Sequence, residues 1–106
     1  MALARIDVPA PARRGEIIEV RILIQHPMET GFRRDAGGTR VPRNAIHSVA
    51  CKCNGQEVFR ATLSSGVAAN PSIRFFMRAV ESGEMELWWL DDEDVEGTFK
   101  SRLVVT

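Results

Sequence analysis

A two-residue alternation of apolar and polar side chains is the feature that most constrains how this chain can fold. In "EIIEVRILIQ", residues 16–25, single residues separate the apolar side chains of Ile18, Val20, Ile22 and Ile24. Successive side chains of an extended strand point to opposite faces of a sheet. The segment therefore predicts a β-strand that buries one face in a core.

The same period recurs along the chain. "SIRFFMRAV", residues 72–80, and "GTFKSRLVV", residues 97–105, each place alternate side chains on one face. Shorter strands are expected at Leu3–Val8, Ala45–Cys53, Glu57–Leu63 and Glu84–Leu90. The pair Asn54-Gly55 predicts a two-residue hairpin turn, because both central positions of such a turn need positive φ.

The strand pattern favours one class of fold. No long segment holds a helical period, and about seven short strands at this spacing favour an all-β, immunoglobulin-like antiparallel sandwich of two sheets. A chain of 106 residues has the length of one ordinary domain. We therefore expect a single domain over residues 1–106.

The charges and the hydropathy argue against two classes of partner. Fourteen basic residues balance fourteen acidic ones, so no nucleic acid partner is expected. No apolar run approaches the ~20 residues that cross a bilayer, so no membrane partner is expected, and the chain by itself would be placed in the cytoplasm.

The charges are unevenly distributed. More than half of the acids lie between Glu81 and Glu96, whereas four arginines lie within residues 26–44. This distribution predicts an electrically two-sided molecule. The run "DDED", residues 91–94, lacks the spacing of a calcium loop and is expected to be a solvated hairpin tip.

Two cysteines lie on one predicted strand. Cys51 and Cys53 are two residues apart, so their side chains share a face with Cα atoms about 6.6 Å apart. A disulfide needs Cβ atoms about 4 Å apart, so we expect both cysteines to be reduced. His26 and His47 do not complete a zinc-type spacing with them, which favours a packing role in the core.

The loop "HPMETGFRRD", residues 26–35, concentrates unusual residues. His26 and Met28 could together bind a soft metal such as Cu(I), although two ligands are few and packing or hydrogen bonding is the simpler role. Phe32 is a large apolar residue in the same loop. Arg33 and Arg34 could recognise an oxyanion or the carboxylate of a partner, or could form a solvated surface.

Four large apolar residues are predicted to face outward. If Ile73, Phe75 and Met77 point into the core, Phe76 and Val80 point away from it, and the same reasoning on residues 84–90 turns Trp88 and Leu90 outward. On adjacent strands these four residues would form one exposed patch, which is typical of a protein-binding face.

No enzymatic template fits the chain. The sequence contains no G-x-S-x-G, no phosphate-binding loop and no H-E-x-x-H motif. We therefore do not expect catalysis by this chain alone.

Several segments, in order, carry a resemblance to a known family. "HPMETGFRRD", "VPRN", "CNGQEVFRA", "AANPSIRFF" and "GEMELWWLDD" closely resemble the SoxZ family of bacterial thiosulfate oxidation, over nearly the whole chain. The resemblance implies an immunoglobulin-like sandwich that pairs with SoxY, a second subunit whose C-terminal tail carries the cysteine that holds sulfur intermediates. This chain ends "KSRLVVT" without such a tail, so it is expected to be the scaffold half.

The resemblance also implies roles for the loop and the apolar patch. Phe76, Val80, Trp88 and Leu90 would contact the SoxY-type partner. His26, Met28, Phe32, Arg33 and Arg34 would form a positively charged docking loop, which would lie near the partner's cysteine-bearing arm or would bind the enzymes that load, oxidise and hydrolyse the cargo, of the SoxAX, SoxB and SoxCD types.

The family further implies a periplasmic heterodimer, exported with its partner, and no cofactor for this chain. Free thiols in an oxidising compartment need protection, so Cys51 and Cys53 are expected to be buried. The alternatives are a metal-binding domain that uses His26 and Met28 and a redox or sulfur-transfer protein that uses Cys51 or Cys53.

Overall fold

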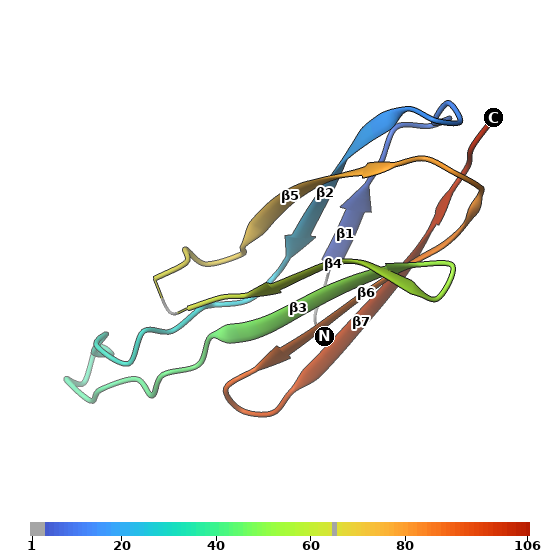
Figure 1. Ribbon diagram of the computed structural model, residues 1–106. Helices are drawn as coiled ribbons and strands as arrows, with labels where there is room; N and C mark the ends of the chain where they lie inside the picture. Colours follow the sequence, from blue (N-terminus) through green and yellow to red (C-terminus); the bar gives the residue numbers. More distant parts are fainter. Residues whose placement is uncertain (1–3, 65) are drawn as a thin grey trace.

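The computed structural model describes residues 4–64 and 66–106, which form seven strands in two antiparallel sheets (Figure 1). The strands are β1 (Ala4–Asp7), β2 (Ile17–Ile24), β3 (Ile46–Cys53), β4 (Gln56–Thr62), β5 (Ser72–Arg78), β6 (Gly83–Asp91) and β7 (Glu96–Leu103). One sheet has the order β1-β2-β5 and the other has the order β4-β3-β6-β7. The predicted all-β, immunoglobulin-like sandwich is confirmed.

The inner faces of the two sheets supply the core, as the alternation predicts. On β2, the side chains of Ile18, Val20, Ile22 and Ile24 are at most 2% exposed. The facing sheet contributes a matching set of buried side chains: Val49, Cys51, Met85, Leu87, Trp89 and Leu103. Burial of large aliphatic and aromatic side chains is the main stabilising contribution to such a sandwich.

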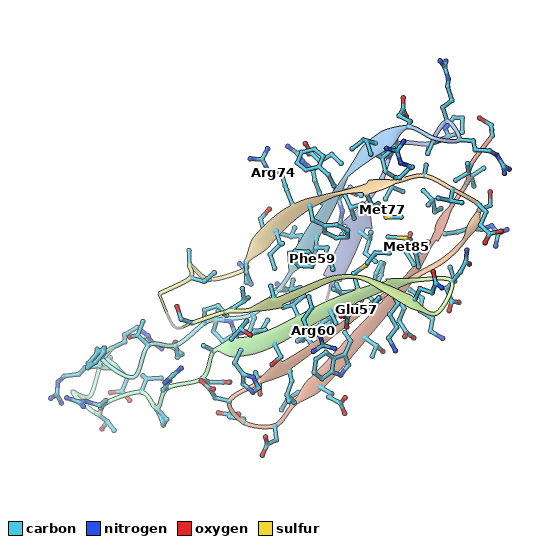
Figure 2. All side chains as sticks on the ribbon, viewed as in Figure 1. Glu57, Phe59, Arg60, Arg74, Met77 and Met85 are labelled. Atoms are coloured by element: carbon cyan, nitrogen blue, oxygen red, sulfur yellow. The ribbon has the colours of Figure 1, made fainter. Side chains whose placement is uncertain are left out.

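An aromatic stack joins the two sheets along one side. Phe59 on β4 and Phe75 on β5 lie with ring centroids 4.6 Å apart and an interplanar angle of 8°. Figure 2 shows Phe59 in the space between the sheets. Such a pair contributes about 0.5–1.5 kcal/mol beyond its buried area.

The predicted strand boundaries are close to the observed ones, with small shifts. The last strand ends at Leu103 and not at Val105, and Leu3 lies outside the described residues. Asn54 and Gly55 have φ angles of 52° and 82° and connect β3 to β4, which confirms the predicted hairpin turn.

The long connection between β2 and β3, residues 25–45, projects from one end of the sandwich as a narrow pair of chain segments (Figure 1). We call it the β2–β3 extension. Backbone bridges between Glu29 and Asn44 and between Arg34 and Arg40 hold its two limbs together. The molecule therefore measures 55 × 22 × 19 Å, more elongated than its sheets alone would make it.

Gly97 makes room for the indole of Trp89 in the core. The two residues are direct cross-strand partners on β7 and β6. A Cβ atom at Gly97 would lie 2.0 Å from Cζ2 of Trp89, which is too close for any real contact. The packing of Trp89 therefore requires glycine at position 97.

We expect Gly97→Ala to lower the free energy of unfolding by about 1–3 kcal/mol, because the new methyl group overpacks the core against Trp89. Gly37→Ala is the matched control, since its Cβ would come no closer than 3.5 Å to another residue. Urea unfolding followed by tryptophan fluorescence measures both variants. Equal stability of the two variants would contradict this account.

Candidate functional site

The base of the β2–β3 extension is fixed by a buried histidine. His26 is 8% exposed, and its Nε2 lies 3.1 Å from Oδ2 of Asp91 on β6. Its Nδ1 accepts a hydrogen bond from the backbone N–H of Met28 at 2.9 Å. Because Nδ1 is an acceptor, the ring proton is on Nε2, which donates to the carboxylate.

The carboxylate of Asp91 accepts this hydrogen bond from His26. It is 5% exposed, and its Oδ1 also accepts the backbone N–H groups of Glu93 at 2.9 Å and Val95 at 3.0 Å. Burial alone would raise the pKa of Asp91, but the hydrogen bonds from Val95, His26 and Glu93 outweigh it and lower the pKa. Asp91 is therefore a charged, fully engaged acceptor at neutral pH.

Met28 provides the second anchor. It is 4% exposed and has a φ of 51°, a left-handed conformation that is uncommon for a residue with a side chain. Its Sδ accepts the backbone N–H of Ile46, the first residue of β3, at 3.3 Å. The thioether therefore connects the start of the extension to the strand at which the extension ends.

An ion pair fixes the returning limb of the extension. Nε of Arg43 lies 3.2 Å from Oδ2 of Asp92, and the same oxygen accepts the N–H of Ala45 at 3.0 Å. Asp92 follows β6 directly, and Asp91 is the last residue of that strand. Both limbs are thus attached to the end of one strand.

The outer part of the extension presents Phe32 and arginine side chains. Phe32 is 79% exposed. Arg33 forms an ion pair of 2.7 Å with Glu29, which raises the pKa of Arg33 and lowers that of Glu29. Nη1 of Arg34 donates to the carbonyl of Gly38 at 2.9 Å, and its guanidinium remains exposed.

These contacts change the predicted docking loop in two respects. His26 and Met28 are buried and hold the loop in place, so they cannot present a surface to another protein. Arg33 is exposed but paired with Glu29, whereas Phe32 and Arg34 are exposed and form no ion pair within the described part of the chain. The structure does not test docking itself, which stays a prediction.

The prediction of two electrically separate sides is wrong at this end of the molecule. Asp91 and Asp92, from the acidic stretch, lie against His26 and Arg43 at the base of the arginine-bearing extension. The expectation of a solvated "DDED" tip is also wrong for Asp91, which is buried, although Glu93 and Asp94 are exposed. Proximity in the fold, which the linear charge pattern does not show, brings opposite charges together.

The sequence contains a signal for the buried pair, namely the alternation of buried and exposed residues beyond the ends of the strands. The inward positions of β2 continue past the strand, from Ile24 to His26 and Met28. On β6, the inward positions continue from Trp89 to Asp91. Alternation continued by one or two steps would have placed His26 and Asp91 inside the sandwich.

The four predicted outward residues do not form one patch. Phe76 lies on the outer face of the three-stranded sheet, whereas Trp88 and Leu90 lie on the outer face of the four-stranded sheet and are only half-buried. Val80 follows β5 and lines a hollow near the β3–β4 turn. The prediction of one shared surface is wrong because β5 and β6 are consecutive in sequence but belong to different sheets.

The two cysteines face the core as free thiols. Cys51 is fully buried, as predicted, whereas Cys53 is half-buried at the end of β3. Burial raises the pKa of Cys51 to about 12, and burial together with Glu81 raises the pKa of Cys53. Both groups are therefore protonated and weakly nucleophilic at neutral pH.

The described residues offer little to a metal ion. No group of three or more His, Cys, Asp or Glu side chains with metal-binding geometry occurs in residues 4–64 and 66–106. Both nitrogens of His26 and the sulfur of Met28 are already engaged. Nδ1 of His47 contacts Oγ of Ser48. The part of the chain that the structure describes also has no helix long and apolar enough to cross a membrane.

Sequence comparison identifies one family. A family model described as "Sulphur oxidation protein SoxZ" matches residues 5–101. No curated protein is significantly similar to the chain in sequence.

Several solved structures share the fold. The superoxide reductase (neelaredoxin) from Ignicoccus hospitalis has a TM-score of 0.72 at 15% identity, over 97% of this chain and 80% of that chain. A putative superoxide reductase from Thermotoga maritima has a TM-score of 0.73 at 14% identity, over 97% and 85%. The sulfur carrier protein SoxY from Chlorobium limicola f thiosulfatophilum has a TM-score of 0.66 at 12% identity, over 97% and 78%. At such low identities these similarities show the fold alone.

We expect Asp91→Asn to lower the free energy of unfolding at pH 7 by about 1–3 kcal/mol, because the N–H of His26 loses its charged acceptor. The folded-state pKa of Asp91 lies below its ordinary value of 3.8. The stabilisation by the carboxylate is therefore present above that pH and is lost as the pH falls through the folded-state value. The difference between wild type and variant in urea unfolding should shrink in that acidic range.

Asp94→Asn is the control for this substitution, because Asp94 lies in the same turn, is exposed and has a φ of 59° that asparagine tolerates. Trypsin cleavage after Arg33 and Arg34 reports the anchoring of the extension directly. Faster cleavage is expected in Asp91→Asn only. Cleavage at the wild-type rate would show that His26 and Asp91 do not hold the extension.

Proposed function

Because the chain belongs to the SoxZ family, we propose that it is the non-catalytic scaffold subunit of a heterodimeric sulfur carrier in thiosulfate oxidation. The family match over residues 5–101 confirms the resemblance expected from the sequence motifs. In this proposal the partner is a SoxY-type subunit whose C-terminal cysteine carries the sulfur intermediates. The chain supplies surfaces for that partner and for the enzymes that act on the cargo.

One observation carries the non-catalytic part of the proposal: the residues with reactive side chains are committed to the fold. His26 and Met28 anchor the β2–β3 extension, and Cys51 is a fully buried thiol with a raised pKa. Two large aromatic side chains reach solvent, with Phe32 79% and Phe76 66% exposed. Exposed aromatic residues suit binding to other proteins.

The same observations weaken the two alternatives. A Cu(I) site would have to break the hydrogen bonds that His26 and Met28 make at the base of the extension. A sulfur-transfer site on this chain would need a thiolate, and burial holds Cys51 and Cys53 in the thiol form.

The proposal places the heterodimer in the periplasm, exported with its partner. Burial protects the Cys51 thiol in that oxidising compartment, and partial burial shields Cys53. The exposed part of the extension, with Phe32 and Arg34, would dock enzymes of the SoxAX, SoxB and SoxCD types. A rigid base with an exposed tip suits brief encounters, because little chain entropy is lost on binding.

The assay for the proposal is intact-mass measurement after co-expression. The chain, purified through a tag together with its SoxY-type partner, is incubated with thiosulfate and the loading enzyme. We expect a sulfur adduct on the partner and unmodified mass for this chain, because its thiols are protonated. An adduct on Cys51 or Cys53 would favour the sulfur-transfer alternative, and failure to co-purify any partner would refute the scaffold role.

The same assay tests the extension. We expect Phe32→Ser and Arg34→Ala to reduce kcat/KM for loading about tenfold, because both side chains are exposed at the proposed docking tip. Val104→Ser and Arg14→Ala, at exposed positions elsewhere, are the matched controls. The heterodimer should remain intact in all four variants. Wild-type loading by the Phe32 and Arg34 variants would rule out docking at this tip.

A further inference from the structure

The outer face of the three-stranded sheet is exposed along its whole length. On β2 and β5 the outward side chains, with the exception of half-buried Glu19, are exposed to solvent. Three of them are large and apolar: Ile17 is 54% exposed, Leu23 is 43% exposed and Phe76 is 66% exposed. An outer sheet face normally carries polar side chains, so these residues are out of place in an isolated chain.

A pair of arginines separates the apolar residues on this face. Arg21 on β2 and Arg74 on β5 are direct cross-strand partners. Leu23 is the next outward residue after Arg21 on β2, and Phe76 is the next outward residue after Arg74 on β5. Because the strands are antiparallel, Leu23 and Phe76 lie on opposite sides of the arginine pair. Like charges directly opposite each other destabilise a sheet, so this arrangement needs a compensating charge.

The chain itself supplies only part of that compensation. Nε of Arg21 bonds Glu19 at 2.8 Å, and Arg5 on β1 pairs with Asp7 at 3.0 Å. The guanidinium of Arg74 makes no hydrogen bond or ion pair with any residue in the described ranges 4–64 and 66–106. Figure 2 shows Arg74 on the side of β5 that faces away from the other sheet.

The arginines surround a shallow hollow. It has a volume of about 410 Å³, and its lining includes Arg5, Arg21 and Arg74 but only one acid, Asp7. Several guanidinium groups around one hollow can bind a carboxylate through paired N–H donors. The geometry therefore favours an anionic group at this position.

The outer face of the four-stranded sheet differs because several of its basic side chains have acidic partners within the chain. Arg60 pairs with Glu57 at 2.7 Å, and Nζ of Lys100 lies 3.7 Å from carboxylates of both Glu84 and Glu86. The indole N–H of Trp88 donates to Glu96, and Trp88 is half-buried. Of the two outer faces, the one on the three-stranded sheet is therefore the better candidate for an interface, because it combines exposed apolar side chains with an arginine that has no ion pair among the described residues.

We infer that the outer face of the three-stranded sheet is covered by a protein surface that packs apolar groups on Leu23 and Phe76 and places a carboxylate between Arg21 and Arg74. A small anion would neutralise the arginines but leave Leu23 and Phe76 in water. A second copy of this chain fits poorly, because four arginines outnumber two acids on the outward positions of β1, β2 and β5. This inference rests on the proposed function in taking the SoxY-type subunit as the partner.

Hydroxyl-radical footprinting of the chain alone and of the heterodimer tests which face is covered. We expect oxidation of Phe76 to fall by at least about fivefold in the heterodimer, as for a residue in an interface core. Oxidation of Trp88, on the opposite face, and of Phe32, on the extension, should not change. Protection of Trp88 with Phe76 still reactive would assign the interface to the other sheet and overturn the inference.

Charge reversal tests the carboxylate. We expect Arg74→Glu to raise the Kd of the heterodimer at least about tenfold and to reduce its salt dependence. Arg102→Glu, an exposed arginine on the outer face of the four-stranded sheet, is the control and should bind within about twofold of wild type. Both sites are exposed, and circular dichroism verifies that the variants fold.

The outcomes separate this inference from the proposed function. A heterodimer that forms normally with Arg74→Glu and leaves Phe76 reactive refutes the inference and leaves the scaffold role standing. A wild-type chain that binds no SoxY-type subunit refutes both.

Discussion

The hydrogen bond between His26 and Asp91 is the contact on which the shape of this molecule most depends. His26 follows the end of β2 in one sheet, and Asp91 is the last residue of β6 in the other. Their contact therefore ties the two sheets together where the chain leaves the core to form the β2–β3 extension. A charged group inside a protein is costly unless it is fully hydrogen-bonded, and Asp91 meets that condition with three donors.

That contact also explains how a long connection can be well positioned without a core of its own. The extension contains few buried side chains beyond its base, so hydrogen bonds and ion pairs hold it in place. Met28 and Arg43 join opposite limbs of the extension to the ends of β3 and β6. Gly31 lies between the limbs with a φ of 91°. A Cβ atom at this position would lie only 3.1 Å from Cβ of Arg43, so the close approach of the limbs favours glycine. The result is an exposed tip on a fixed base.

The sequence predicted the sandwich well, because two-residue periodicity follows directly from which face is buried. It predicted the site poorly, because the site depends on which strands share a sheet. Phe76 and Trp88 were correctly expected to point outward, yet they lie on different faces of the molecule. Strand order depends on long-range contacts, such as the pairing of β2 with β5 and of β3 with β6. The local spacing of apolar residues does not determine which strands pair.

The two outer faces then suggest how the domain can be both stable and ready to assemble. On the four-stranded sheet, Arg60 and Lys100 pair with glutamates, which keeps that surface compatible with water. On the three-stranded sheet, Arg74 lacks an acidic partner among the described residues and lies near the exposed Phe76, so this face lacks both a counter-charge and an apolar cover at one place. A protein that satisfied both needs at once would bind this face in one orientation, because the carboxylate fixes the register and the apolar contacts supply the affinity.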